Sequence, residues 1–227
     1  YALTEAPGIL GHSHEKWPLR PGSAGRPLPG HRLALLDSQG QPCSSGSAGQ
    51  LALNSRDIHG HPDPCLFLSY WGNEALTQAR HLDGWFLTGD MASFDQDGYC
   101  WFLGRVDDVF RSGDHRISPL EIEDCLRQHP GVSDAAVVPK PEGARGYSIK
   151  AFIVPADDSP AAQAELEHAL QNHVCERLAA WQMPQHIEIV DRLPITADGQ
   201  IRRHVLRARE QQRSMLASAR TAPKDTL

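Results

Sequence analysis

The 227-residue sequence contains no apolar run long enough to cross a bilayer. Its longest apolar stretches, such as Ala135-Ala136-Val137-Val138, are the size of one strand, whereas a membrane helix needs roughly 20 apolar residues. Basic residues are not in surplus either, because the formal net charge is -6. This charge favours neither nucleic acid nor an anionic membrane as a partner. Together these features are typical of a soluble globular protein.

Cysteine pairs of the kind that form disulfide frameworks or thiolate zinc sites are also missing. The five cysteines are odd in number, scattered and without a C-x-x-C pair, so we expect reduced thiols and a cytoplasmic location. Histidines gather at His12-Ser13-His14 and His59-Gly60-His61. Neither cluster has a known zinc spacing, although Asp63 and Cys65 follow the second. Metal binding by these clusters is not expected.

The first half of the chain is rich in Gly and Pro, with short apolar stretches between turns. This pattern predicts a small antiparallel β-barrel or sandwich. The predicted strands are residues 32–36, 49–53, 85–88 and 99–103.

The second half alternates between helical and strand patterns. Ser118-Pro119-Leu120-Glu121 combines an N-cap serine, a proline at the first helical position and a glutamate that can close a capping box, which predicts a helix over 119–128. Strands are predicted at 135–138, 149–154 and 186–190, and further helices at 162–178 and 203–211.

This order predicts an α+β fold in two domains. A small antiparallel β-barrel subdomain is followed by a small α+β domain, with a three-stranded sheet and helices. The composition changes near 105–108, so the predicted boundaries are 1–104 and 105–212, followed by a mobile tail over 213–227.

Six short motifs occur in one order along the chain. They are Tyr1-Ala2-Leu3-Thr4-Glu5, the Gly-Ser-Ala-Gly-Arg-Pro-Leu-Pro-Gly stretch at 22–30, Gly-Trp-Phe-Leu-Thr-Gly-Asp at 84–90, Gly-Arg-Val-Asp-Asp at 104–108, Arg-Ile-Ser-Pro-Leu-Glu-Ile-Glu at 116–123, and Leu-Pro-Ile-Thr-Ala-Asp-Gly-Gln-Ile-Arg-Arg at 193–203. The ordered set resembles the acyl-CoA synthetases of the adenylate-forming (AMP-binding) ligase superfamily. It is similar to their C-terminal part, and the start at Tyr1 is expected of a piece of a longer chain.

The resemblance implies a ligase that activates a small carboxylic acid with ATP and then forms a thioester with CoA. A short- or medium-chain fatty acid is expected as the substrate, and ATP or AMP, Mg²⁺ and CoA as the other ligands. The first half would be the distal, β-rich part of the N-terminal AMP-binding domain, and the second half the lid domain. The family's phosphate loop, rich in Gly, Ser and Thr and ending in Lys, has no counterpart here. The chain by itself is therefore expected to be inactive and to need the rest of the N-terminal domain.

The resemblance also implies roles for residues of the first half. Asp90 would accept hydrogen bonds from both ribose hydroxyls, and Arg105 would contact the ribose or the phosphates. Tyr1 would lie beside the adenine, Thr4 would bind the α-phosphate, and Glu5 would hold Mg²⁺. We expect residues 1–5 to be disordered when cut away from the rest of their domain.

In the second half, Asp107 matches the hinge about which the family's lid rotates. Gly113 lies in the loop that approaches the pantetheine channel, and Arg116 belongs to the cofactor-binding set. The usual glycine and tyrosine of this loop are Asp114 and His115 here.

Gln200 is the main departure from the family pattern, because the resemblance places a catalytic lysine at this position. Glutamine lacks the positive charge that stabilises adenylation, so this half-reaction should be slower by roughly a hundredfold or more unless Arg202 or Arg203 compensates. A pseudoenzyme or regulatory module is one alternative. An adenylation module of a peptide synthetase is another.

Overall fold

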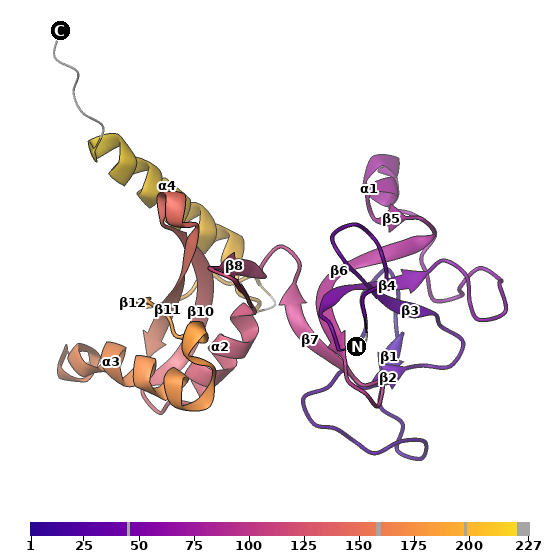
Figure 1. The fold of residues 1–227 in the computed structure, drawn as a ribbon, viewed down its shortest axis with the longest axis horizontal. Helices are drawn as coiled ribbons and strands as arrows, with labels where there is room; N and C mark the ends of the chain where they lie inside the picture. The colour runs from indigo at the N-terminus through magenta and orange to yellow at the C-terminus, as the bar shows by residue number, and fades with distance from the viewer. Residues whose placement is uncertain (45, 158–159, 198, 222–227) are drawn as a thin grey trace, which may run out of the picture. The chain divides into compact units, whose positions relative to one another are not determined.

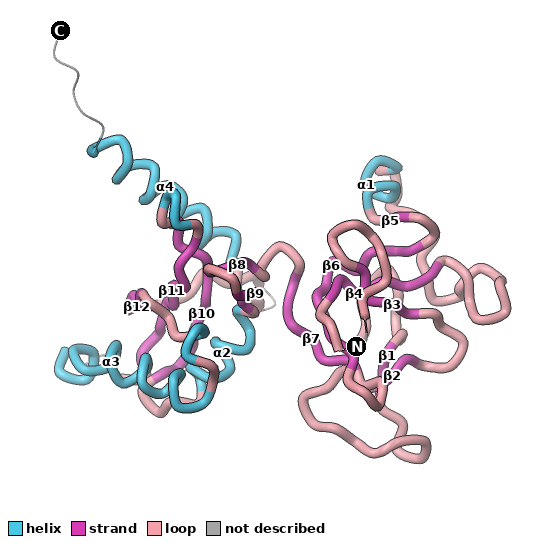
Figure 2. The backbone as a smooth tube through the Cα atoms, viewed as in Figure 1, coloured by secondary structure: helices cyan, strands magenta, loops and turns pink. Residues whose placement is uncertain are grey.

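The computed structural model describes residues 1–44, 46–157, 160–197 and 199–221. The chain divides into two compact units, Tyr1–Asp107 and Asp108–Leu227. Figure 2 shows that strands and loops make up most of the first unit, whereas helices pack beside a sheet in the second. Within the described part of the chain, no helix is both long enough and apolar enough to span a membrane.

The first unit is built on a curled antiparallel sheet with β6 at its centre (Figure 1). β4 pairs with one edge of β6, and β5 and β7 pair with the other. Register shifts in the β4–β6 and β6–β7 pairings mark bulges, which increase the bend and twist of a sheet. The elements are β1 (Leu10–Gly11), β2 (Arg26–Pro27), β3 (Leu33–Leu36), β4 (Gly49–Asn54), α1 (Glu74–Ala79), β5 (His81–Leu82), β6 (Trp85–Phe94) and β7 (Cys100–Arg105).

The core of the first unit lies inside this curled sheet. Leu35, Leu51 and Leu53 from β3 and β4 pack with Ala92 of β6 and Cys100 of β7. Burial raises the pKa of the Cys100 thiol to about 12, so this side chain is a neutral core residue. All five cysteines of the chain are free thiols.

The second unit has a three-stranded sheet whose two faces are both covered. β11 is antiparallel to β10 and parallel to β12. Val137 and Ile153 face α2 and α3, whereas Val138 and Phe152 pack with Leu206 of α4. Because successive strand residues point to opposite faces, burial of both faces explains the unbroken apolar run in β10. The elements are β8 (Phe110–Ser112), β9 (His115–Ile117), α2 (Pro119–Arg127), β10 (Val132–Pro141), β11 (Tyr147–Pro155), α3 (Pro160–Arg177), β12 (His186–Ile189) and α4 (Arg203–Thr221), with 3₁₀ turns at Gly143–Arg145 and Ala180–Gln182.

The predicted α+β fold class is therefore confirmed. The prediction of a capping box at the start of α2 is wrong. Ser118 is the N-cap and Pro119 follows at the start of the helix, yet the Ser118 side chain makes no capping hydrogen bond. The Glu121 carboxylate instead accepts a hydrogen bond of 2.7 Å from Gln182 Nε2. A partner distant in sequence has thus replaced the local one.

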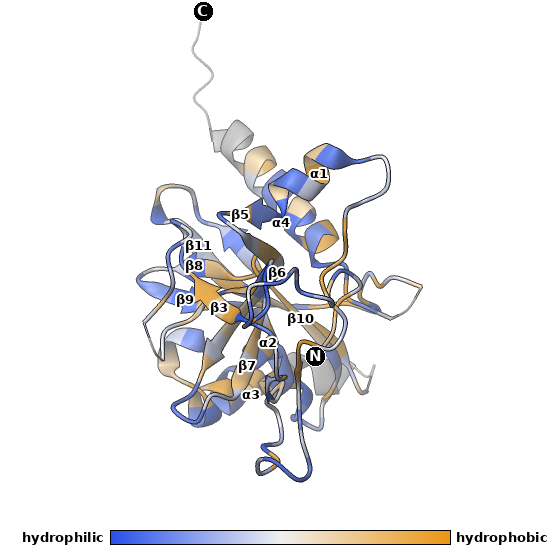
Figure 3. Cartoon of the chain, turned by 90° about the vertical axis from the view of Figure 1, so that its right-hand side faces the viewer, coloured by the Kyte–Doolittle hydropathy of each residue, from blue (hydrophilic) through white to orange (hydrophobic). Residues whose placement is uncertain are grey.

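The predicted tail starts at residue 213, whereas α4 continues through Thr221, so the first part of this segment is helical. Figure 3 shows hydrophilic and hydrophobic residues alternating along this helix. Arg213 Nη1 donates to Glu188 of β12 at 2.5 Å, and Lys150 Nζ donates to Glu210 of α4 at 2.9 Å. Burial alone would raise the pKa of Glu188, but its hydrogen bonds from Arg213 and Lys150 lower it to about 2. The remainder of the predicted tail, 222–227, lies outside the described residues.

A buried ion pair holds the start of α4 against α2. The Glu123 side chain is 0% exposed and accepts hydrogen bonds from Arg203 Nη2 at 2.5 Å and from the Val137 amide at 2.8 Å. Arg203 Nη1 also lies 3.6 Å from Asp108. Because the Arg203 guanidinium already contacts Glu123 and Asp108, it is not expected to replace the lysine that the family has at position 200.

Arg203→Met should destabilise the second unit by about 3–5 kcal/mol, because it leaves Glu123 buried without its main cationic partner. The free energy of unfolding would be measured by urea denaturation followed by circular dichroism. Arg202→Met is the matched control, since Arg202 is exposed and its loss should change stability by no more than about 0.5 kcal/mol. Equal stability of the two variants would show that the buried pair does not stabilise the unit.

Candidate functional site

A buried carboxylate, Asp90, lies where β6 and β7 pair. Asp90 stands opposite Arg105 in the strand register, and only 9% of its side chain is exposed. Arg105 Nη1 donates to Asp90 Oδ1 at 2.7 Å and to the Thr88 carbonyl at 3.3 Å. The Tyr1 hydroxyl donates to the other carboxylate oxygen, Oδ2. The structure therefore brings together Tyr1, Asp90 and Arg105, three residues to which the resemblance assigns nucleotide contacts.

The first five residues are held in place, so the prediction that they are disordered is wrong. Besides the Tyr1–Asp90 contact, the Phe67 amide donates to the Glu5 carbonyl at 2.8 Å, and the Tyr70 hydroxyl donates to Glu5 Oε1 at 2.6 Å. Burial, and then the hydrogen bond and charge of Asp90, raise the pKa of Tyr1 above its ordinary value. The Tyr1 phenol therefore stays protonated and remains a donor at neutral pH.

The Asp90 carboxylate retains unused hydrogen-bond acceptor capacity. Each carboxylate oxygen has two lone pairs, so one protein donor on each oxygen leaves further acceptor capacity. The Tyr1 hydroxyl occupies a position on Asp90 that a ligand hydroxyl could share or take. A fixed acceptor beside a guanidinium donor suits a ligand that carries both hydroxyl and anionic groups.

Gly89 precedes Asp90 with a backbone φ of +81°, a conformation that glycine adopts without strain. A Cβ at this position would lie 2.7 Å from Arg105 Nη2 and 2.7 Å from Arg80 Nη1. Arg80, Gly89, Arg105 and Asp107 are among the residues that line a cavity of about 250 Å³. Asp107, the predicted hinge residue, thus stands beside the site of the first unit.

Sequence reasoning missed Tyr70 and Arg80. Tyr70 supports Glu5, and Arg80 reaches Gly89 from the C-terminal cap of α1. No motif contains either residue, and α1 was not among the predicted helices. The Arg80 carbonyl accepts a hydrogen bond of 2.8 Å from the Leu87 amide of β6, so tertiary pairing and no local motif brings Arg80 to this position.

The other predicted site residues are at the surface. Thr4 is exposed in the first unit. In the second unit, Gly113 has φ +58° in the turn between β8 and β9, and Arg116 is an exposed residue of β9. Gln200 lies in an exposed loop, where its backbone amide donates to Thr196 Oγ1 at 2.9 Å.

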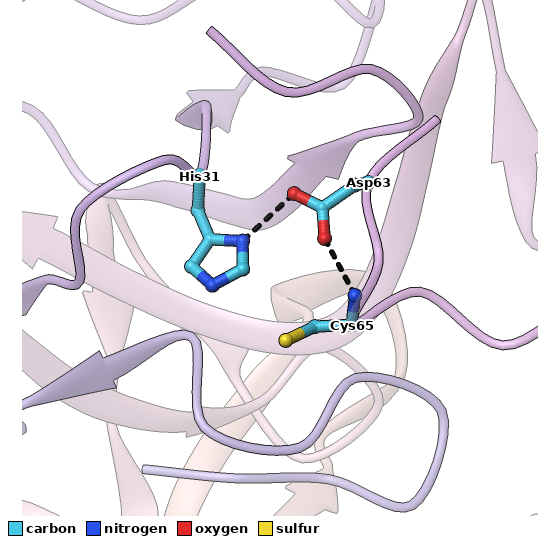
Figure 4. A group of neighbouring side chains, drawn as sticks. All are labelled: His31, Asp63 and Cys65. Atoms are coloured by element: carbon cyan, nitrogen blue, oxygen red, sulfur yellow. Dashed lines mark hydrogen bonds and ion pairs between the residues drawn. The ribbon is translucent and has the colours of Figure 1, made fainter. Parts of the chain in front are cut away.

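The residues around His31 form a candidate metal cluster (Figure 4). Within the described part of the chain, ligand atoms of His31, Asp63 and Cys65 gather within 4.8 Å of one another. Asp63 accepts hydrogen bonds from His31 Nδ1 at 2.7 Å and from the Cys65 amide at 2.9 Å. Imidazole and thiolate suit Zn²⁺ better than Mg²⁺. The existing hydrogen bonds already give each oxygen of the buried Asp63 carboxylate a donor.

Residues 121–200 match a known protein family, described as the AMP-binding enzyme C-terminal domain. The chain thus contains an AMP-binding enzyme C-terminal domain and is similar to acyl-CoA synthetases of the adenylate-forming superfamily. It is 37% identical over 212 residues to an uncharacterized acyl-CoA ligase of Bacillus subtilis (strain 168), covering 93% of this chain and 39% of that protein. It is also 38% identical over 212 residues to the mitochondrial acyl-coenzyme A synthetase ACSM4 of Rattus norvegicus, covering 92% of this chain and 36% of the relative.

A solved acyl-CoA synthetase structure has the same fold. The anthranilate CoA ligase AuaEII, crystallised in complex with anthranoyl-AMP, is similar with a TM-score of 0.74 and 36% sequence identity. The similarity covers 85% of this chain and 36% of that one. The chain therefore spans well under half of the length of the acyl-CoA synthetases that it matches.

Gly89→Ala should lose more stability than Gly84→Ala, although both replace a glycine with nearly the same positive φ, +81° and +82°. Each variant should lose about 1–2 kcal/mol from the backbone conformation alone. Gly84 has open space around its Cβ position, whereas at Gly89 the new methyl group must displace the ends of two arginine side chains, and weakening the Arg105–Asp90 hydrogen bond should cost a further 0.5–1.5 kcal/mol or so. Thermal denaturation would compare the two variants. Equal losses would mean that Arg80 and Arg105 move aside freely.

Proposed function

We propose that this chain is the C-terminal part of an ATP-dependent acyl-CoA synthetase, which joins a carboxylic acid to AMP and then transfers the acyl group to CoA. The main supporting observation is the buried Asp90 carboxylate held between Tyr1 and Arg105. Residues 1–104 would be the distal part of the N-terminal AMP-binding domain and 105–212 the lid, with the hinge at Asp107. The division of the chain after Asp107 agrees with this assignment.

In this proposal the first unit binds the nucleoside end of ATP. Asp90 accepts hydrogen bonds from the ribose hydroxyls, and Arg105 donates to the ribose or to a phosphate. Tyr1 lies beside the adenine and Thr4 binds the α-phosphate. Since Arg105 is already oriented by Asp90, little side-chain entropy is lost when it binds the ligand.

Glu5 fits the proposed role of a Mg²⁺ ligand. Mg²⁺ is usually bound by one or two carboxylates together with substrate phosphates. The Tyr70 hydroxyl occupies Glu5 Oε1 and orients the carboxylate, while Oε2 accepts no hydrogen bond from a described residue. When bound, Mg²⁺ would neutralise phosphate charge.

The second unit supplies the groups that the lid presents in the two half-reactions. In the proposal, the loop of Gln200 serves adenylation, and the β8–β9 hairpin with Gly113 and Arg116 serves thioester formation with CoA. His115 of this hairpin stacks on Trp181, with ring centroids 4.4 Å apart and planes within 5°. The stack stiffens the hairpin beside its glycine turn.

The proposed substrate is a short- or medium-chain fatty acid, and the proposed cellular role is fatty acid metabolism in the cytoplasm. The chain by itself is proposed to be inactive, because the phosphate loop and the acyl pocket belong to the rest of the N-terminal domain in this family. Gln200 favours a second candidate, a pseudoenzyme or regulatory module that binds nucleotide without adenylation. The two candidates differ in whether pyrophosphate exchange can be measured.

Asp90→Asn in the longer protein that contains this chain should lower kcat/KM for ATP in pyrophosphate exchange roughly 10- to 100-fold, because a charged acceptor for the ribose is lost. Asp83→Asn is the matched control: Asp83 is exposed in the same unit, and asparagine tolerates its positive φ of 48°. Similar kinetics for the two variants would contradict the proposed nucleotide site.

Gln200→Lys in the same protein should raise pyrophosphate exchange by roughly a hundredfold or more, because it restores a positive charge near the reacting groups. Acyl transfer to CoA from a synthetic adenylate should barely change. The two half-reactions would be measured separately, with Gln212→Lys on the exposed face of α4 as the control for added charge. An unchanged and substantial exchange rate would show that Arg202 or another cation replaces the lysine. No exchange in either form, with nucleotide binding retained, would favour the pseudoenzyme.

A further inference from the structure

Arg80 places a second guanidinium group beside that of Arg105. Arg80 caps the C-terminus of α1, and its Nη1 lies 2.7 Å from the Cβ position of Gly89. Arg105 Nη2 lies 2.7 Å from the same point. The two nitrogen atoms are therefore at most about twice that distance apart, and both lie beside Gly89.

Among the described residues, one carboxylate, Asp90, forms an ion pair with these two positive charges. Arg105 uses Nη1 to bind Asp90 and directs Nη2 toward Arg80. Arg80 forms no ion pair with any carboxylate of the described residues. Asp107 lines the same cavity but is in ion-pair contact with neither guanidinium in the described part of the chain. Two like charges this close repel each other, so an anion between them would be stabilised.

The Tyr70 side chain interacts with Arg80 and also contacts Glu5, one of the first five residues. Burial and the Glu5 hydrogen bond raise the pKa of the Tyr70 phenol, and the nearby Arg80 guanidinium offsets part of that rise. Tyr70 in turn donates to Glu5. Arg80 is partly buried, so less side-chain freedom remains to be lost when it binds a ligand.

The cavity and the donor geometry define the kind of ligand. A volume of about 250 Å³ exceeds what one phosphate group needs, and the absence of a side chain on Gly89 lets the ligand approach the backbone. Guanidinium forks match phosphate oxygens in pairs of hydrogen bonds. We propose that Arg80 and Arg105 together bind a phosphate group, of either the nucleotide or CoA, in this cavity. The inference rests on the proposed acyl-CoA synthetase function and adds a binding residue that none of the six motifs contains.

Titration of the ¹⁵N-labelled chain with inorganic pyrophosphate, followed by NMR, tests the site directly. Pyrophosphate should shift the Gly89 and Val106 amides saturably with millimolar affinity, and Arg80→Gln should weaken this binding roughly tenfold or more. Arg32→Gln is the matched control, because Arg32 is exposed in the same unit and loses the same charge. Equal affinities for the two variants, or no saturable shift in the unmodified chain, would overturn the proposal.

Three further ligands identify the source of the phosphate. If Arg80→Gln abolishes a preference for CoA over 3′-dephospho-CoA, the site binds the 3′-phosphate of CoA. If Arg80→Gln weakens the binding of AMP while CoA and 3′-dephospho-CoA still bind with equal affinity, the site binds the nucleotide phosphate. If Arg80→Gln weakens pyrophosphate binding but changes the affinity of none of these three ligands, the assignment to nucleotide or CoA is wrong.

Asp90→Asn separates this inference from the proposed function. Failure of the function would appear as AMP binding that does not depend on Asp90. Failure of the inference would appear as pyrophosphate binding that does not depend on Arg80.

Discussion

The candidate site depends on placing one carboxyl group, Asp90, in a largely buried position. A buried polar group is tolerated only when it is hydrogen-bonded, and Arg105 and Tyr1 meet this need from β7 and from the start of the chain. The β6–β7 register sets Arg105 directly opposite Asp90. The same register turns the other side of the Arg105 guanidinium toward Gly89 and Arg80. Pairing with Asp90 therefore orients Arg105 within the site.

The second unit also contains a buried carboxylate that needs a hydrogen-bonded partner. Glu123 is fully buried, and its partner Arg203 ties the first turn of α4 to α2. The loop that carries Gln200 ends at this fixed point, and the β10–β11 sheet beneath α4 is packed on both faces. The loop thus stands on a rigid support, so the residue at position 200 can change while its backbone setting is kept. A Gln-to-Lys exchange at position 200 therefore tests the side-chain charge without changing the backbone of the loop.

Local sequence signals predicted many of the elements because these signals act over a few residues. Turn residues, the Ser118-Pro119 helix start and apolar strands all describe short-range preferences. The predictions failed where a distant partner decided the outcome. Glu121 binds Gln182 rather than closing a capping box, and the Tyr1 segment is ordered by Asp90 and Tyr70. The ion pairs from Arg209 and Arg213 of α4 to Glu188 of β12 are likewise contacts that helical propensity does not predict.

The sequence by itself determined the family, the α+β class and the candidate roles of Tyr1, Asp90 and Arg105, because these follow from motifs whose order can be recognised without coordinates. Only the tertiary structure decided that these three side chains meet, and that Arg80 and Tyr70 join them. Strand pairing and loop packing bring together residues from separate parts of the chain, and no short motif encodes such pairings. The same reason explains why His31, Asp63 and Cys65 form a cluster that the histidine spacing did not predict.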